Sequence, residues 1–111
     1  YYDFAGPGDN HAERIMLAEA LGPHYALIMR NHGLLTVGRT IGEAMVTMVV
    51  LEQSIKTQLL AMSTGAELNF PPEEIMDKTG KDREARNERN NEADWQSLLE
   101  VVDRIDPSYR N

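Results

Sequence analysis

A single histidine, His32, lies at a tight bend between two apolar segments of the chain. The segments 25–29 and 34–37 are short and apolar, as buried strands are. Asn31 and Gly33 flank the histidine and tolerate a positive φ, so the spacing predicts a sharp reversal between two strands. A turn fixes the direction of a side chain without burying it, and a neutral imidazole is a common zinc ligand. His32 is therefore either a metal ligand or a structural turn residue.

One histidine does not complete a metal site. A catalytic zinc usually has three protein ligands, and neither a His-x-His nor a His-Glu-x-x-His motif occurs near His32. The chain contains no cysteine, which excludes thiolate ligands and disulfides. If His32 binds a metal, we expect the other ligands to come from residues outside this chain.

The other candidate side chains have structural interpretations. His11 is expected in the first turn of a helix and His24 in a turn, both at the surface. Glu43 occupies the third position of a capping box, which explains it better than a role as a general base. Glu52 and Lys56 have the spacing of an ion pair along one helix face. We assign none of these residues to catalysis or substrate binding.

The elements that position His32 fall within residues 1–65, which form the apolar part of the chain. A short strand or extended arm is expected in residues 1–8, followed by a helix that begins after Asn10. The longest apolar helix is predicted over 41–64, and its wide apolar stripe indicates burial on more than one side, against a sheet and a second subunit. We interpret 1–65 as one part of a domain.

Residues 66–111 form a polar, acidic C-terminal extension. Their formal net charge is −5, whereas that of residues 1–65 is −2. A helix start is expected at Pro72, and the almost wholly polar stretch 77–94 is interpreted as a solvated helix or loop. A separate terminal helix is predicted from Trp95 to the proline at 107, docking through the Trp95 side chain.

Composition excludes several classes of partner. The chain of 111 residues has a formal net charge of −7 and no basic stripe, so we expect no nucleic-acid partner. No apolar run approaches the roughly 18 residues of a membrane span, so no membrane partner is expected. The absence of cysteine is compatible with a reducing compartment, and we expect a cytoplasmic protein.

Residues 1–65 resemble the C-terminal half of the class II aldolase/adducin domain. The most specific part is the Arg-Asn-His-Gly-Leu-Leu-Thr-Val-Gly motif followed by Glu-Ala. The matching residues are Tyr2-Asp3-Phe4, Gly6-Pro7, Glu13-Arg14, Leu21-Gly22, the segment 26–40 and Glu43-Ala44.

The resemblance implies an α/β fold with three layers, α/β/α, around a largely antiparallel central sheet, of which this chain is the C-terminal portion. It implies homo-oligomers, often tetramers. A further expected partner is the N-terminal half of the same domain, which is missing from this chain. Family enzymes hold a divalent metal, usually zinc, through three histidines, and the third corresponds to His32. The first two lie in an upstream His-x-His motif, which this chain lacks. The family's catalytic and substrate-binding residues also lie upstream, so the resemblance assigns none of them to this chain.

The function implied is that of a metal-dependent lyase of the aldolase, epimerase or decarboxylase type. Such an enzyme cleaves or rearranges a small hydroxy-carbonyl or carboxylate substrate through a metal-stabilised enediolate. The alternative is a non-catalytic, adducin-like protein-interaction module, which shares the fold. An upstream His-x-His favours the enzyme and its loss favours the module. The 111-residue chain alone is expected to be inactive.

Overall fold

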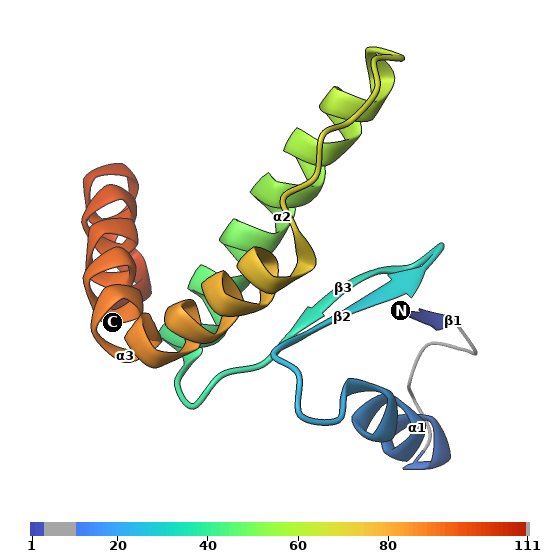
Figure 1. Cartoon of the computed structure of the whole chain (residues 1–111). Coiled ribbons are helices and arrows are strands. Elements are labelled where there is room, and N and C mark those ends of the chain that lie inside the picture. The colour runs from blue at the N-terminus through green and yellow to red at the C-terminus, as the bar shows by residue number, and fades with distance from the viewer. Residues whose placement is uncertain (4–10, 111) are drawn as a thin grey trace. The chain divides into compact units, whose positions relative to one another are not determined.

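The computed structural model in Figure 1 describes residues 1–3 and 11–110, and the side chains of all of these except 83–90. The described chain forms two compact units, Tyr1–Glu52 and Gln53–Asn111. Helix α2 (Ile41–Ser63) begins in the first unit and ends in the second. The predicted domain boundary after residue 65 stays a prediction.

The first unit contains a three-stranded sheet in the order β1-β2-β3 (Figure 1). The strands are β1 (Tyr2–Asp3), β2 (Ala26–Arg30) and β3 (Gly33–Thr36). β2 and β3 are antiparallel and form a hairpin, whereas β1 pairs with β2 in parallel. With its helices this mixed sheet confirms the predicted α/β class.

The two strands of the hairpin are each displaced by one residue from their predicted bounds. The sequence predicted 25–29 and 34–37, and the structure has Ala26–Arg30 and Gly33–Thr36. β2 extends to Arg30 because that residue pairs with Asp3 of β1, a partner that hydropathy does not reveal.

The core of the described chain is small. Leu27 of β2 and Val46 of α2 are each only 4% exposed, and both lie in the first unit. Leu27 pairs across the hairpin with Leu35, which is half-buried. The hairpin is therefore anchored in the middle of its strands and presents its turn to solvent.

Helix α1 (His11–Leu21) ends as the sequence predicted. Gly22 follows it with a φ of 53°, and its N–H donates to the carbonyl of Ala18 over 3.0 Å. A glycine with positive φ is the usual residue just beyond a helix C-terminus. The predicted N-cap, Asn10, lies outside the described residues.

Helix α2 has its predicted bounds to within one residue, and within the described chain its buried residues lie at its start. Its buried residues are Gly42, Glu43 and Val46, all in the first two turns. Beyond them apolar side chains are exposed, and Leu60 is 71% accessible. Periodicity reveals an apolar face but not the chain that covers it, so burial against a second subunit stays a prediction.

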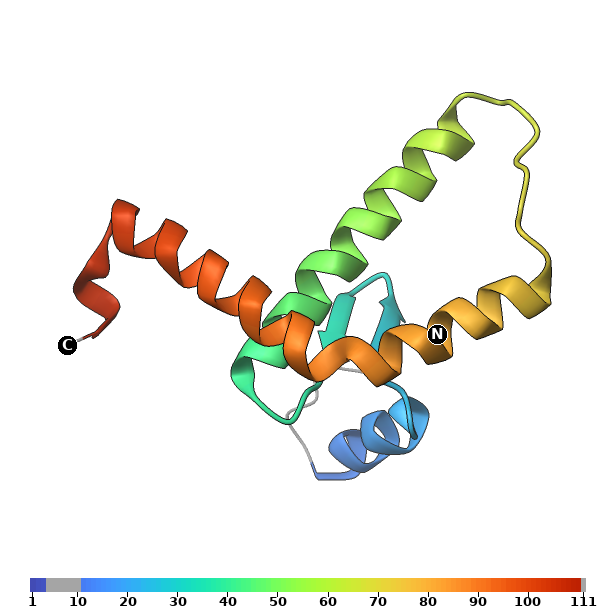
Figure 2. The ribbon, with the colours of Figure 1, turned by 60° about the vertical axis from the view of Figure 1, so that its left-hand side comes forward.

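The second unit corrects the prediction of a separate terminal helix. Residues 64–72 leave α2 without helix or strand, and one continuous helix, α3 (Glu73–Ile105), then follows (Figure 2). The polar stretch 77–94 contains no proline and is rich in Lys, Arg and Glu, which have good helix propensity. The polar stretch is therefore part of the helix, and Trp95, which is half-buried, lies in the same helix.

A 3-10 turn, η1 (Pro107–Arg110), closes the second unit. Arg110 donates from Nε and Nη2 to the two carboxylate oxygens of Asp103, over 2.7 and 2.6 Å. The hydroxyl of Tyr109 donates to the same carboxylate over 2.8 Å. Hydrogen bonds from Arg110 and then Tyr109 hold the pKa of Asp103 below its ordinary value.

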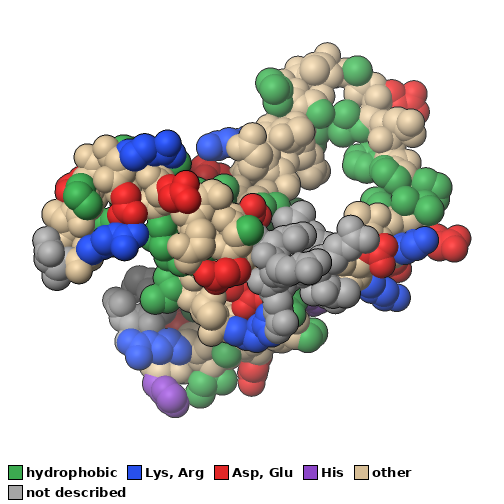
Figure 3. Space-filling view, turned by 90° about the vertical axis from the view of Figure 1, so that its left-hand side faces the viewer, with side chains coloured by type: hydrophobic (Ala, Val, Ile, Leu, Met, Phe, Trp, Pro, Cys, Tyr) green, Lys and Arg blue, Asp and Glu red, His purple; other side chains and the backbone are tan. Residues whose placement is uncertain are grey.

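The surface matches the mixed charge of the sequence. On the face seen in Figure 3, Lys and Arg side chains are interspersed with Asp and Glu. No helix in the described ranges is both long and apolar enough to cross a membrane.

Candidate functional site

The turn that carries His32 has a defined backbone conformation. The N–H of His32 donates to the carbonyl of Met29 over 3.1 Å, which closes a four-residue turn at the end of the hairpin. Asn31, the third residue of that turn, has a φ of 58°. A positive φ at this position is typical of a type II turn, and Asn adopts it more readily than most residues. The predicted reversal is confirmed.

The His32 side chain is exposed at the tip of the hairpin, where it can reach a ligand. The other two histidines, His11 and His24, are also exposed, as predicted. Within the described ranges no three His, Cys, Asp or Glu side chains lie close enough together to hold a metal ion. His32 therefore offers one donor, and the described residues do not complete a three-ligand site around it.

A cluster of side chains beside the turn was not predicted from the sequence. Nη1 of Arg30 lies 2.7 Å from Oδ1 of Asp3, the residue opposite it on β1. The guanidinium carbon of Arg30 also lies 5.6 Å from the centre of the Tyr1 ring, within the range of a cation–π contact. Asp3 and Arg30 are 27 residues apart, so local spacing gives no signal of this pairing.

Glu43 has the structural role that its spacing predicted. Its N–H donates to Oγ1 of Thr40 over 3.0 Å, which is half of a capping box. Its carboxylate accepts the backbone N–H of Arg39 over 2.6 Å, one residue before the cap, and lies 3.3 Å from Nε and Nη2 of the same arginine. Side-chain and then backbone hydrogen bonds from Arg39 lower the pKa of Glu43. A buried carboxylate held in this way is ionised and already occupied, so it is not a free general base.

The loop between β3 and α2 is fixed by close packing. A Cβ atom at Gly38 would lie 2.6 Å from the backbone nitrogen of Ala44 and 2.9 Å from Cβ of Glu43. Oγ1 of Thr36, at the end of β3, donates to the carbonyl of Ala44 over 2.9 Å. These contacts connect the hairpin that carries His32 to the first turn of α2.

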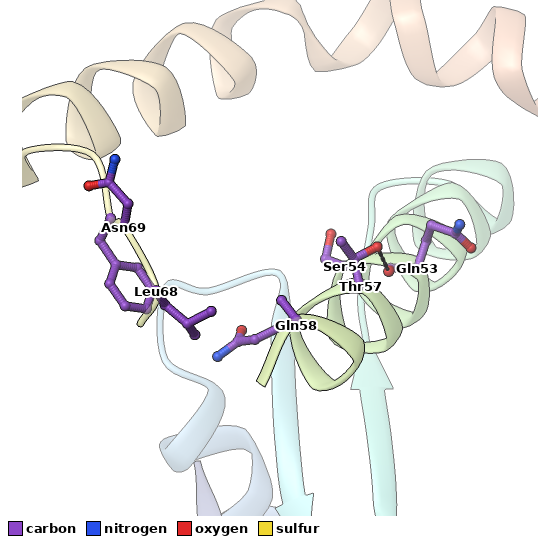
Figure 4. A pocket seen from close by; sticks show the side chains of 8 residues that line it. Gln53, Ser54, Thr57, Gln58, Leu68 and Asn69 are labelled. Carbon is purple, nitrogen blue, oxygen red and sulfur yellow. Dashed lines mark hydrogen bonds between the residues drawn. The ribbon is translucent and has the colours of Figure 1, made fainter. Parts of the chain in front are cut away.

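The second unit contains a cavity of about 460 Å³ between α2 and the segment that follows it (Figure 4). Its polar lining consists of amides and hydroxyls, and the rest of its lining is apolar. The lining residues are Gln53, Ser54, Thr57, Gln58, Ala61, Leu68, Asn69 and Phe70. The lining contains no carboxylate or imidazole, so these residues offer hydrogen bonds and apolar contact rather than acid–base chemistry or strong metal ligation.

Comparison with known proteins identifies relatives of the first unit and of the whole chain. Residues 1–59 match the family described as the class II aldolase and adducin N-terminal domain. An aldolase class 2 family protein of Pseudomonas aeruginosa is 32% identical over 99% of this chain and 44% of its own length. Beta-adducin of Homo sapiens is 38% identical over 58% of this chain and 9% of its own length.

A solved structure resembles the chain over its whole length. It is the crystal structure of an aldolase II superfamily protein from Pseudomonas syringae, which is 32% identical with a TM-score of 0.87. The match covers 100% of this chain and 45% of that one. The chain thus spans less than half the length of these bacterial relatives.

Proposed function

The chain belongs to the class II aldolase and adducin family, and on that premise we propose that it is part of a metal-dependent lyase. The proposed metal is zinc, and the proposed substrate is a small hydroxy-carbonyl compound or carboxylate. The observation that carries the proposal is His32, an exposed imidazole on a hydrogen-bonded turn. The resemblance to the family assigns the role of metal ligand to this histidine.

The residues present fit one position of such a site. An exposed imidazole on a fixed turn can donate to a metal without a large conformational change. Further ligands would come from outside the described residues, since these contain no group of three side chains that could hold a metal ion. When bound, the metal would act as a Lewis acid on an oxygen of the substrate.

Two other contacts in the first unit have a structural role: they help to fix the elements that position His32. The capping contacts of Glu43 fix the start of α2, and the close approach at Gly38 fixes the loop that joins α2 to the hairpin. The proposal assigns no general acid, general base or substrate-binding residue to the described chain.

The extent of the matches favours an enzyme over an adducin-like interaction module. The bacterial aldolase class 2 relatives align with 98–99% of this chain, including the C-terminal extension, whereas the adducins align with 57–60%. A shared fold does not itself decide function, so the module remains the alternative. A homo-oligomer, tetrameric by family resemblance, and a cytoplasmic location are further parts of the proposal.

The test is the metal content of the full-length protein, measured by elemental mass spectrometry beside two variants. We expect about one zinc per chain in the wild type, as for a single catalytic site, and its loss in His32→Ala. His24→Ala is the matched control because this histidine is also exposed and lies in the same unit. It should retain the metal.

Two results would contradict the proposal. One is a wild-type protein that is folded but takes up no divalent metal even after incubation with zinc, which would favour the interaction module. The other is equal loss of zinc from both histidine variants, which would show that His32 has no special role.

A further inference from the structure

We propose that the ion pair between Asp3 and Arg30 is a positioning device that fixes the turn carrying His32. The inference rests on the proposed function in one respect, that the group being positioned is a metal ligand. The ion pair joins β1 to β2 next to the turn between β2 and β3.

The first step is the place of Arg30 in the turn. It is the last residue of β2 and also the second residue of the four-residue turn that ends at His32. Within the turn a backbone hydrogen bond runs from the His32 N–H to the Met29 carbonyl. The end of a two-stranded hairpin frays easily, because solvent competes for its backbone hydrogen bonds.

The second step is what holds Arg30 from outside the hairpin. Strand β1 places Asp3 opposite Arg30 in a parallel register, and the carboxylate lies 2.7 Å from Nη1. The ring of Tyr1 lies 5.6 Å from the same guanidinium. Arg30 is thus restrained by two side chains from outside the hairpin, Asp3 of β1 and Tyr1, which precedes β1.

The third step connects this restraint to His32. Restraining the second residue of a turn limits the conformations of the fourth, because only a few backbone dihedral angles separate them, among them the φ of 58° at Asn31. The apparent affinity for the metal rises in proportion to the fraction of time that the metal-binding side chain spends in its binding conformation. The ion pair is exposed, with 60% of the Arg30 and 82% of the Asp3 side chain accessible, so the effect should be modest.

The experiment compares hydrogen exchange of two amides in the metal-free full-length protein. The reporter is the His32 amide, and the control is the Val37 amide, which bonds to Tyr25 at the other end of the same hairpin over 3.0 Å. In Asp3→Asn the His32 amide should exchange about two- to fivefold faster, as expected for loss of an exposed ion pair. The Val37 amide should be unchanged.

Charge swapping separates positioning from a general structural role. Asp3→Arg alone should raise exchange at His32 more than Asp3→Asn, because two arginines would face each other. The double variant Asp3→Arg/Arg30→Asp should restore it, since the pair is re-formed with its charges exchanged. Zinc affinity, measured by chelator competition, should fall by about two- to fivefold in Asp3→Asn and recover in the double variant.

The outcomes distinguish this inference from the proposed function. Unchanged exchange at His32 in Asp3→Asn overturns the inference, and so does an equal rise at His32 and Val37, which would report loosening of the whole hairpin. Failure of the wild type to bind zinc overturns the proposed function, while the exchange data still decide whether the ion pair fixes the turn.

Discussion

Replacing Glu43 should destabilise the fold in a way that depends on pH. The side chain of Glu43 is buried and accepts three hydrogen bonds from Arg39, one from the backbone and two from the guanidinium. Glu43→Gln keeps the shape of the side chain but removes its charge. Glu43→Ala removes the acceptor entirely and leaves the Arg39 backbone N–H without it.

The magnitude follows from the separate contacts. The bond from the Arg39 N–H is short, at 2.6 Å, and a hydrogen bond to a charged group contributes about 1.5–3 kcal/mol. The guanidinium contacts are longer, at 3.3 Å, and the Arg39 side chain is 61% exposed, so they add at most about 1 kcal/mol. We therefore expect a loss of about 2–4 kcal/mol in Glu43→Ala and about 1–2 kcal/mol in Glu43→Gln.

The pH dependence follows from the direction of the pKa shift. Arg39 lowers the pKa of Glu43 in the folded protein below its ordinary value of 4.5. The ionised carboxylate therefore stabilises the fold fully above the unfolded-state pKa, and this stabilisation is lost as pH falls through the lower folded-state pKa. The difference between wild type and Glu43→Gln should be largest near neutral pH and should shrink below about pH 4.

The assay is urea unfolding of the full-length protein, followed by circular dichroism at pH 7 and again below pH 4. Glu52→Gln is the control, because this carboxylate is exposed on the same helix, and it should change the free energy of unfolding by less than about 0.5 kcal/mol. The reasoning is refuted if Glu43→Gln matches wild type at pH 7. It is also refuted if the difference between them does not depend on pH.

Three further substitutions test other parts of the structure. Gly38→Ala should cost about 1–3 kcal/mol in urea unfolding, because its Cβ would lie 2.6 Å from the Ala44 nitrogen; an unchanged midpoint would show that the loop can move. At Asn31, whose φ is 58°, glycine should be tolerated and valine should cost about 1–2 kcal/mol by the same assay; equal stability of the two variants would contradict the turn assignment. Asp103→Asn should loosen the 3-10 turn by weakening the bidentate contact with Arg110, seen as faster carboxypeptidase release of the C-terminal residues; unchanged release would argue against that contact.

Elements defined by local signals were predicted well. The end of α1 at Gly22, the turn at Asn31 and the cap of α2 at Thr40 each depend on residue types within four positions of one another. Such signals act through backbone φ preference and short-range hydrogen bonds, which do not need the rest of the fold. The position of His32 on a turn was predictable for the same reason.

Long-range features were not predictable from the same patterns. β1 has only two residues, and its pairing with β2 joins Asp3 to a residue 27 positions away. The continuity of α3 was also missed, because uniform polarity in 77–94 removes the apolar periodicity by which a helix is recognised. There, helix propensity was the better guide than periodicity.

The contrast between Glu43 and His32 shows how far one chain can define a site. Glu43 is buried, and its carboxylate accepts hydrogen bonds from Arg39 within the first unit. Removing its charge should therefore lower the free energy of unfolding. His32 is exposed, and the described residues supply one imidazole where a catalytic zinc needs three protein ligands. Its substitution should therefore change metal content and leave the free energy of unfolding of the metal-free protein almost unchanged. A histidine whose loss lowered that free energy by as much as Glu43→Gln would be a structural turn residue, and the lyase proposal would lose the observation that carries it.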